Sequence, residues 1–206
     1  YRGRVLGVLM LSQFFAAFPL GMVTALIQLQ YAHHHQASGV SWLSIVSQVG
    51  CVVAIVGLMR VTLRQGRRLA LVAGMGLMLA ASMLGLVSAL LDTDLLLYLV
   101  AFLLGAGLAT NWYIPFAATD FSPKTSRASD FSYVLSMTAI GMALGSPVVN
   151  YTYYLEQQAE LPLGFIGFTL CMLCCVASVI ILWFGLYPIA DTMQQSEHLS
   201  EDDARF

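Results

Sequence analysis

Six long apolar stretches, separated by short polar segments, constrain this chain more than any other feature of its sequence. Each stretch is about 20 to 25 residues long, enough for a tilted helix to cross the roughly 30 Å hydrocarbon core of a bilayer. Only helices and closed barrels satisfy their backbone hydrogen bonds there, and no stretch shows the apolar–polar alternation of a barrel strand. We therefore predict an all-α membrane protein with six transmembrane helices, over residues 5–29, 40–59, 69–91, 95–118, 131–154 and 163–187.

The composition agrees with a chain embedded in lipid. Hydrophobic residues make up 59% of the 206 residues and charged residues only 10%, whereas soluble domains carry about 25% charged residues. A soluble fold of this size could not bury so much apolar surface, and so apolar a chain is not disordered. The four cysteines lie within the apolar stretches and imply no disulfides.

The basic residues predict how the helices are oriented. All nine lie outside the stretches on one predicted side: Arg2, Arg4, Arg60, Arg64, Arg67, Arg68, Lys124, Arg127 and Arg205. The opposite connections carry histidines and acids instead: His33, His34, His35, Asp92, Asp94, Glu156 and Glu160. Because cytoplasmic loops are enriched in Lys and Arg, we predict that both termini are cytoplasmic. Segment 191–206 is acidic and is expected to be a cytoplasmic tail or an interdomain linker.

Uncharged polar residues are concentrated in the first, second, fourth and fifth stretches. Polar groups in a bilayer face protein or water, so these four helices are expected to surround a polar cavity, with the third and sixth outside. The residues predicted to form a substrate cavity are Gln13, Phe14, Gln48, Asn111, Trp112 and Tyr113. Their amide and hydroxyl groups offer hydrogen bonds and their rings, together with that of Phe15, offer stacking surface. For any single amide, an interhelical hydrogen bond is the alternative interpretation.

Small residues and prolines predict how the helices pack and bend. Gly141 and Gly145 form a GxxxG pattern, which is typical of closely packed membrane helices. Pro19, Pro115 and Pro147 each remove a helical hydrogen bond, so we predict kinks at these positions.

Neither a metal site nor a catalytic site is predicted. The soft ligands of the chain are the run His33–His35 and the cluster Cys171, Cys174 and Cys175. Adjacent histidines at a helix end point in different directions, and cysteines in apolar helices mostly behave as small hydrophobes. No hydrolase, zinc, Walker or dinucleotide motif occurs, so we expect no metal, no cofactor and no enzymatic activity. The basic residues do not cluster on a folded face, so no nucleic acid partner is expected either.

Residues 59–68 resemble the loop between the second and third helices in each half of major facilitator superfamily transporters, roughly G-x-x-x-D-R-x-G-R-R. Four residues match this pattern: Arg64, Gly66, Arg67 and Arg68. Met59 stands at the first Gly, and Leu63 replaces the Asp that helps lock neighbouring helices in the family. The resemblance implies that the matching residues form a cytoplasmic gating loop, and Gly66 is expected to allow a tight turn.

Other segments extend the resemblance over about residues 5–187. Residues 105–115, followed by 122–124, look like the region between the fourth and fifth helices of fourteen-span drug:proton antiporters. Residues 141–147 are similar to a Gly-Pro motif of the superfamily, with the proline one place late. The resemblance implies a six-helix half bundle. The absence of acids inside the spans fits a C-terminal half better, because coupling acids often lie in the N-terminal one.

A lone half would leave its cavity face exposed. We therefore expect a second six-helix half, from the same chain or another protomer, and Tyr1 in place of Met likewise indicates a fragment or a processed product. The expected function is secondary transport of a small organic solute, with efflux favoured, across the lipid bilayer of an inner (plasma) membrane. The alternative is a non-transporting membrane assembly factor or a receptor-like partner on the same fold.

Overall fold

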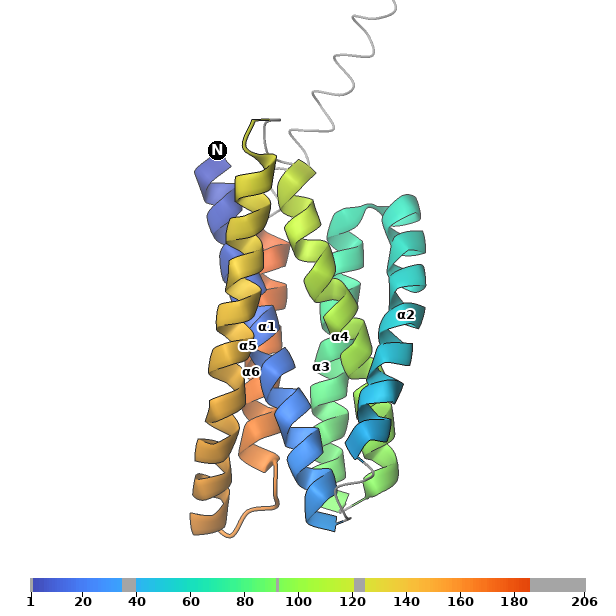
Figure 1. Ribbon diagram of the computed structural model, residues 1–206, viewed down its shortest axis with the longest axis vertical. Helices are drawn as coiled ribbons and strands as arrows, with labels where there is room; N and C mark the ends of the chain where they lie inside the picture. Colours follow the sequence, from blue (N-terminus) through green and yellow to red (C-terminus); the bar gives the residue numbers. More distant parts are fainter. Residues whose placement is uncertain (1, 35–39, 92, 121–124, 186–206) are drawn as a thin grey trace, which may run out of the picture.

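The computed structural model describes residues 2–34, 40–91, 93–120 and 125–185, and these ranges contain six helices and no strand (Figure 1). The helices are α1 Arg2–His34, α2 Val40–Gln65, α3 Arg67–Leu91, α4 Asp94–Asp120, α5 Arg127–Gln158 and α6 Phe165–Gly185. All six are long and apolar enough to cross a membrane. The predicted all-α architecture with six membrane-length helices is confirmed. The predicted acidic tail, 191–206, lies outside the described residues.

Two groups of three helices make up the bundle. Helix α1 packs along α5 and α6, and α4 packs along α2 and α3. The groups meet where α1 crosses α4 and where α3 lies against α6. Helices α2 and α5 therefore occupy opposite flanks, as Figure 1 shows. Although α1 and α2 are consecutive in the chain, they hardly touch, and this separation shapes the site described below.

Glycines let neighbouring helices approach backbone to backbone. A Cβ atom at Gly145 would lie 2.2 Å from the carbonyl oxygen of Phe18 on α1, and one at Gly141 would lie 2.8 Å from Cβ of Ala17. At the α2–α4 contact, a Cβ at Gly105 would lie 2.1 Å from the carbonyl oxygen of Ser47. These spaces admit no side chain, so the close packing predicted from the GxxxG pattern is confirmed.

The turn between α2 and α3 consists of a single residue. Gly66 has a φ of 87°, a left-handed conformation that glycine adopts without strain. Its N–H donates to the carbonyl oxygen of Thr62 at 3.1 Å, which satisfies one of the free carbonyls at the end of α2. The tight turn predicted at Gly66 is therefore present.

A buried carboxylate fixes the start of α6. Glu156 lies in the last turn of α5, not in the connection where the sequence analysis placed it, and it is only 1% exposed. Its oxygen Oε2 accepts from the N–H of Gly164 at 2.8 Å, while Oε1 accepts from Ile166 at 2.7 Å and Gly167 at 3.2 Å. The first N–H groups of a helix have no partner within it, and its N-terminus favours negative charge. Glu156 thus holds the end of α5 to the beginning of α6.

The three prolines lie inside continuous helices: Pro19 in α1, Pro115 in α4 and Pro147 in α5. Pro19 and Pro115 are buried, whereas Pro147 is exposed on the flank of the bundle. Kinks at these positions stay a prediction.

Candidate functional site

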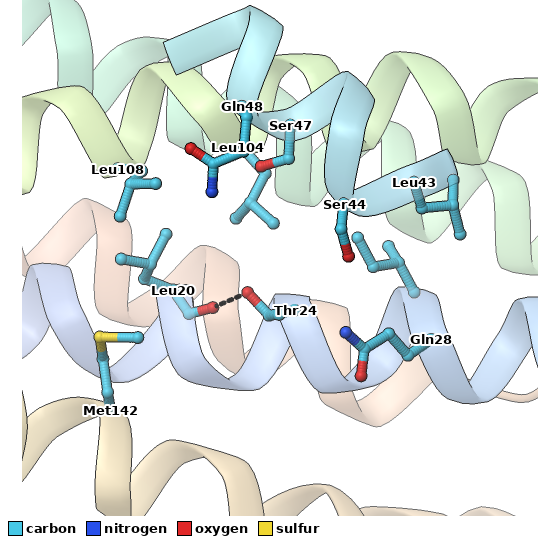
Figure 2. Close-up of a pocket in the computed structure, with 11 residues that line it drawn as sticks. Leu20, Thr24, Gln28, Leu43, Ser44, Ser47, Gln48, Leu104, Leu108 and Met142 are labelled. Atoms are coloured by element: carbon cyan, nitrogen blue, oxygen red, sulfur yellow. Dashed lines mark hydrogen bonds between the residues drawn. The ribbon is translucent and has the colours of Figure 1, made fainter. Parts of the chain in front are cut away.

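A polar pocket of about 260 Å³ opens between α1 and α2 (Figure 2). It is lined by Leu20, Thr24, Ile27, Gln28, Leu43, Ser44, Ser47, Gln48, Leu104, Leu108 and Met142. These residues come from α1, α2, α4 and α5, and α3 and α6 contribute none. They are the same four helices that the sequence analysis expects around a cavity. The pocket forms because α1 and α2 both pack against α4 and hardly touch each other, which leaves a gap between them.

Helical spacing brings the polar residues of the pocket to facing surfaces. Ser44, Ser47 and Gln48 lie three and four positions apart and so share one face of α2, as Thr24 and Gln28 share one face of α1. Figure 2 shows the α2 side chains pointing across the gap toward Thr24 and Gln28. Two helices thus present amide and hydroxyl groups to one space.

Most of these polar groups have no partner among the residues that the structure describes. The hydroxyl of Thr24 donates to the carbonyl oxygen of Leu20 at 2.7 Å. Within the described part of the chain, four other pocket side chains make no hydrogen bond: Gln28, Ser44, Ser47 and Gln48. Gln28 and Ser47 are half-buried, and Ser44 and Gln48 are exposed. These side chains are therefore open to water or to a bound molecule, and a polar group left without either is unfavourable in a bilayer. None of the eleven lining residues carries a charge.

Two residues predicted for the cavity form a buried link between helices. Gln13 on α1 and Asn111 on α4 are 0% and 3% exposed, and neither lines the pocket. The amide nitrogen of Gln13 donates to the backbone carbonyl of Asn111 at 3.1 Å and also contacts the Asn111 side-chain oxygen and the Thr138 hydroxyl on α5. This link matches the alternative interpretation, an interhelical hydrogen bond. Oxygen Oε1 of Gln13 and nitrogen Nδ2 of Asn111 have no partner in the described ranges.

The predicted aromatic residues are not among those that line the pocket. Phe14 is half-buried and packs on α1 against Phe15 and Phe18, with ring centroids 5.6 and 6.3 Å apart. Trp112 is 55% exposed on α4, and Tyr113 is half-buried. Among the six predicted cavity residues, Gln48 alone lines this pocket. A solute-binding role for the other five stays a prediction.

The pocket also contains polar residues that the sequence analysis did not select. Thr24, Gln28, Ser44 and Ser47 all contribute to its wall. The signal available in the sequence was their spacing, since each set shares a helix face. Which face of α1 is turned toward which face of α2 follows only from the packing of both helices on α4.

The predicted gating loop lies at the opposite end of α2 from the pocket's Leu43 and Ser44. Arg64 is exposed and, with Arg60, borders a surface hollow of about 330 Å³. Arg67 and Arg68 form the first turn of α3, and their side chains are not described. The gating role of this loop stays a prediction.

Comparison with known proteins agrees with this architecture. The uncharacterized MFS-type transporter YddS of Bacillus subtilis (strain 168) is 27% identical over 150 residues, covering 71% of this chain and 34% of that protein. The chain thus spans about a third of the length of the curated relative it matches. No solved structure matches the chain significantly. The family model of the Major Facilitator Superfamily, however, matches residues 9–200. The chain therefore belongs to the Major Facilitator Superfamily.

Proposed function

We propose that this chain is one six-helix half of a secondary transporter that moves a small organic solute across a membrane by alternating access. The observation that carries the proposal is the polar pocket between α1 and α2, where amides and hydroxyls without a hydrogen bond to any described residue face one space between apolar helices. Superfamily transporters bind solute at the interface of two halves, and rocking of one half against the other exposes the site to each side in turn.

The surface around the pocket supports a second half as the covering partner, from the same polypeptide or another protomer. Helix α2 borders the pocket and exposes a run of large apolar side chains: Val49, Val52, Val53, Val56 and Met59. Helix α5, on the opposite flank, is exposed along much of its length. A second bundle laid across α2 and α5 would enclose the pocket and cover apolar surface that exceeds single scattered residues.

The orientation we propose places both termini in the cytoplasm of a cell whose inner (plasma) membrane holds the protein. Figure 1 shows the N-terminus, the α2–α3 turn and the start of α5 at one end of the bundle. The described basic residues belong to these segments, and such residues favour the cytoplasmic side. Efflux coupled to protons, as in antiporters, is the direction suggested by the resemblance of residues 105–115 to drug:proton antiporters.

Solute accumulation in bacterial cells tests the proposal. Cells that lack their own major efflux systems would produce the full-length protein, the variant Ser47→Trp, which fills the pocket, or the control Leu173→Trp on the exposed surface of α6. We expect the wild-type protein and the control to lower the accumulation of at least one radiolabelled small organic solute, and Ser47→Trp to abolish this effect. A raised accumulation would indicate uptake. No effect of the wild-type protein on any solute would favour the assembly factor or receptor-like partner.

A further inference from the structure

We infer that the pocket between α1 and α2 selects electroneutral solutes that combine an amide- or hydroxyl-type polar group with a small apolar body, and that Gln28 and Gln48 determine this selectivity. The inference rests on the proposed transport function, because it names the class of solute that the proposed site would take. It goes further by assigning the selectivity to two side chains on two different helices.

The polar wall offers hydrogen-bond donors and acceptors in combination. The primary amides of Gln28 and Gln48 each carry two N–H donors and a carbonyl acceptor, and the hydroxyls of Ser44 and Ser47 can act as either. Neither glutamine makes a hydrogen bond to another described residue. A solute that both donates and accepts therefore satisfies groups on α1 and α2 at once. A solute lacking either capacity would leave some of them unpaired, which is unfavourable away from water.

The wall provides nothing that balances an ionic charge. No lining residue is acidic, basic or a histidine. Among the side chains that the structure describes, the buried carboxylates are Asp130 and Glu156. Both lie at the ends of α5 and outside the pocket, and Glu156 is already bound to the start of α6. Transfer of an ion from water into such surroundings requires a partner of opposite charge. The wall that this chain supplies therefore favours a neutral solute.

The remaining wall limits the size of the solute and favours an apolar body. Six lining residues are hydrophobic: Leu20, Ile27, Leu43, Leu104, Leu108 and Met142. Figure 2 shows Met142 at the edge of the gap, where its flexible thioether can adapt to different shapes. The volume of about 260 Å³ lies just below the roughly 300–1,000 Å³ of sites for drug-sized ligands. A single-ring aromatic amide is a suitable probe.

Three probes of nearly the same shape separate charge from size: benzamide, the benzamidinium cation and the benzoate anion. Their binding to the purified full-length protein would be titrated by saturation-transfer NMR. We expect benzamide to bind at least about tenfold more tightly than either ion. Gln28→Met or Gln48→Met should weaken benzamide binding about five- to tenfold, since each removes hydrogen bonds at nearly constant volume. The matched control is Gln157→Met, at an exposed glutamine whose amide nitrogen donates to the Tyr153 hydroxyl of its own helix, and it should leave binding unchanged.

A substitution that introduces a charge distinguishes a change in selectivity from a loss of binding through misfolding. Gln48→Glu keeps the shape of the side chain, and at pH 8 it should reverse the preference, so that benzamidinium binds more tightly than benzamide. Three results would overturn the inference: binding of either ion to the wild type as tightly as benzamide, unchanged benzamide binding in both methionine variants, or no binding of any probe.

Flux through proteoliposomes, with protein-free vesicles as the measure of leak, tests the transport function separately. Glutamine-dependent binding of benzamide without protein-dependent flux would refute transport and leave the solute class standing. Flux that prefers an ion would support transport and overturn the solute class.

Discussion

Two glycines on α2 allow the packing of the bundle to be tested with the same substitution at two sites. Gly50 faces α4, and a Cβ there would lie 2.0 Å from the carbonyl oxygen of Phe102 and 2.8 Å from its carbon. Gly57, two turns further along, has no such neighbour within 4 Å. Gly50→Ala and Gly57→Ala therefore add the same methyl group to the same helix, once into a backbone contact and once into open space.

The expected difference in stability follows from these distances. Ordinary contact of a Cβ atom begins near 3.4 Å, so Gly50→Ala forces α2 away from α4 by on the order of 1 Å. A gap of this size forfeits a quarter to a half of the dispersion attraction between the two helices. Overpacking of this kind costs about 1–3 kcal/mol. Alanine also gains about 0.5–1 kcal/mol of helix propensity over glycine, but this gain is the same at both positions of α2 and cancels. We therefore expect Gly50→Ala to be less stable than Gly57→Ala by about 1–3 kcal/mol.

Unfolding of the full-length protein in detergent micelles, titrated with a denaturing detergent, measures this difference. Tryptophan fluorescence is a suitable signal, because Trp42 lies on α2 and Trp112 on α4. Gly50→Ala should also weaken probe binding, since the displaced segment of α2 carries Ser47 and Gln48. Equal stability of the two variants, or a lower stability of Gly57→Ala, would refute the inferred backbone contact between α2 and α4.

Three further predictions concern the capping carboxylate, the buried amide link and the orientation. Glu156→Gln should lower the free energy of unfolding by about 1–2 kcal/mol, because an amide has one acceptor oxygen and no charge for the start of α6; the exposed control Glu160→Gln should change it by less than about 0.5 kcal/mol in the same unfolding assay. Gln13→Leu should lower it by about 1–3 kcal/mol, because it removes the hydrogen bonds that join α1 to α4 and α5, and a neutral result would contradict a stabilising role for this link. A membrane-impermeant maleimide applied to intact cells should label Ala159→Cys, whereas Thr125→Cys should react only after the membrane is opened; the reverse pattern would place the termini outside the cell.

Features that depend on local sequence could be predicted in advance. The six helices follow from the length of the apolar stretches, because a membrane span must satisfy its backbone hydrogen bonds within itself. The turn at Gly66 follows from a residue that adopts positive φ without strain. Close packing at Gly141 and Gly145 follows from their lack of side chains at helical spacing. Each of these features involves one segment or one face of a helix.

The site depended on contacts between segments far apart in the chain. Gln13 and Gln28 are equally polar residues of α1, yet the first is buried against Asn111 of α4 while the second faces the pocket. The sequence places Glu156 in a loop, but the chain after α5 turns back so that the backbone N–H of Gly164, next to the start of α6, donates to the Glu156 carboxylate. The sequence alone determined that the described chain forms six membrane-length helices, because that depends on the transfer of each segment into lipid. Only the tertiary structure decided which polar side chains meet, since the gap between α1 and α2 exists because both helices pack on α4 rather than on each other.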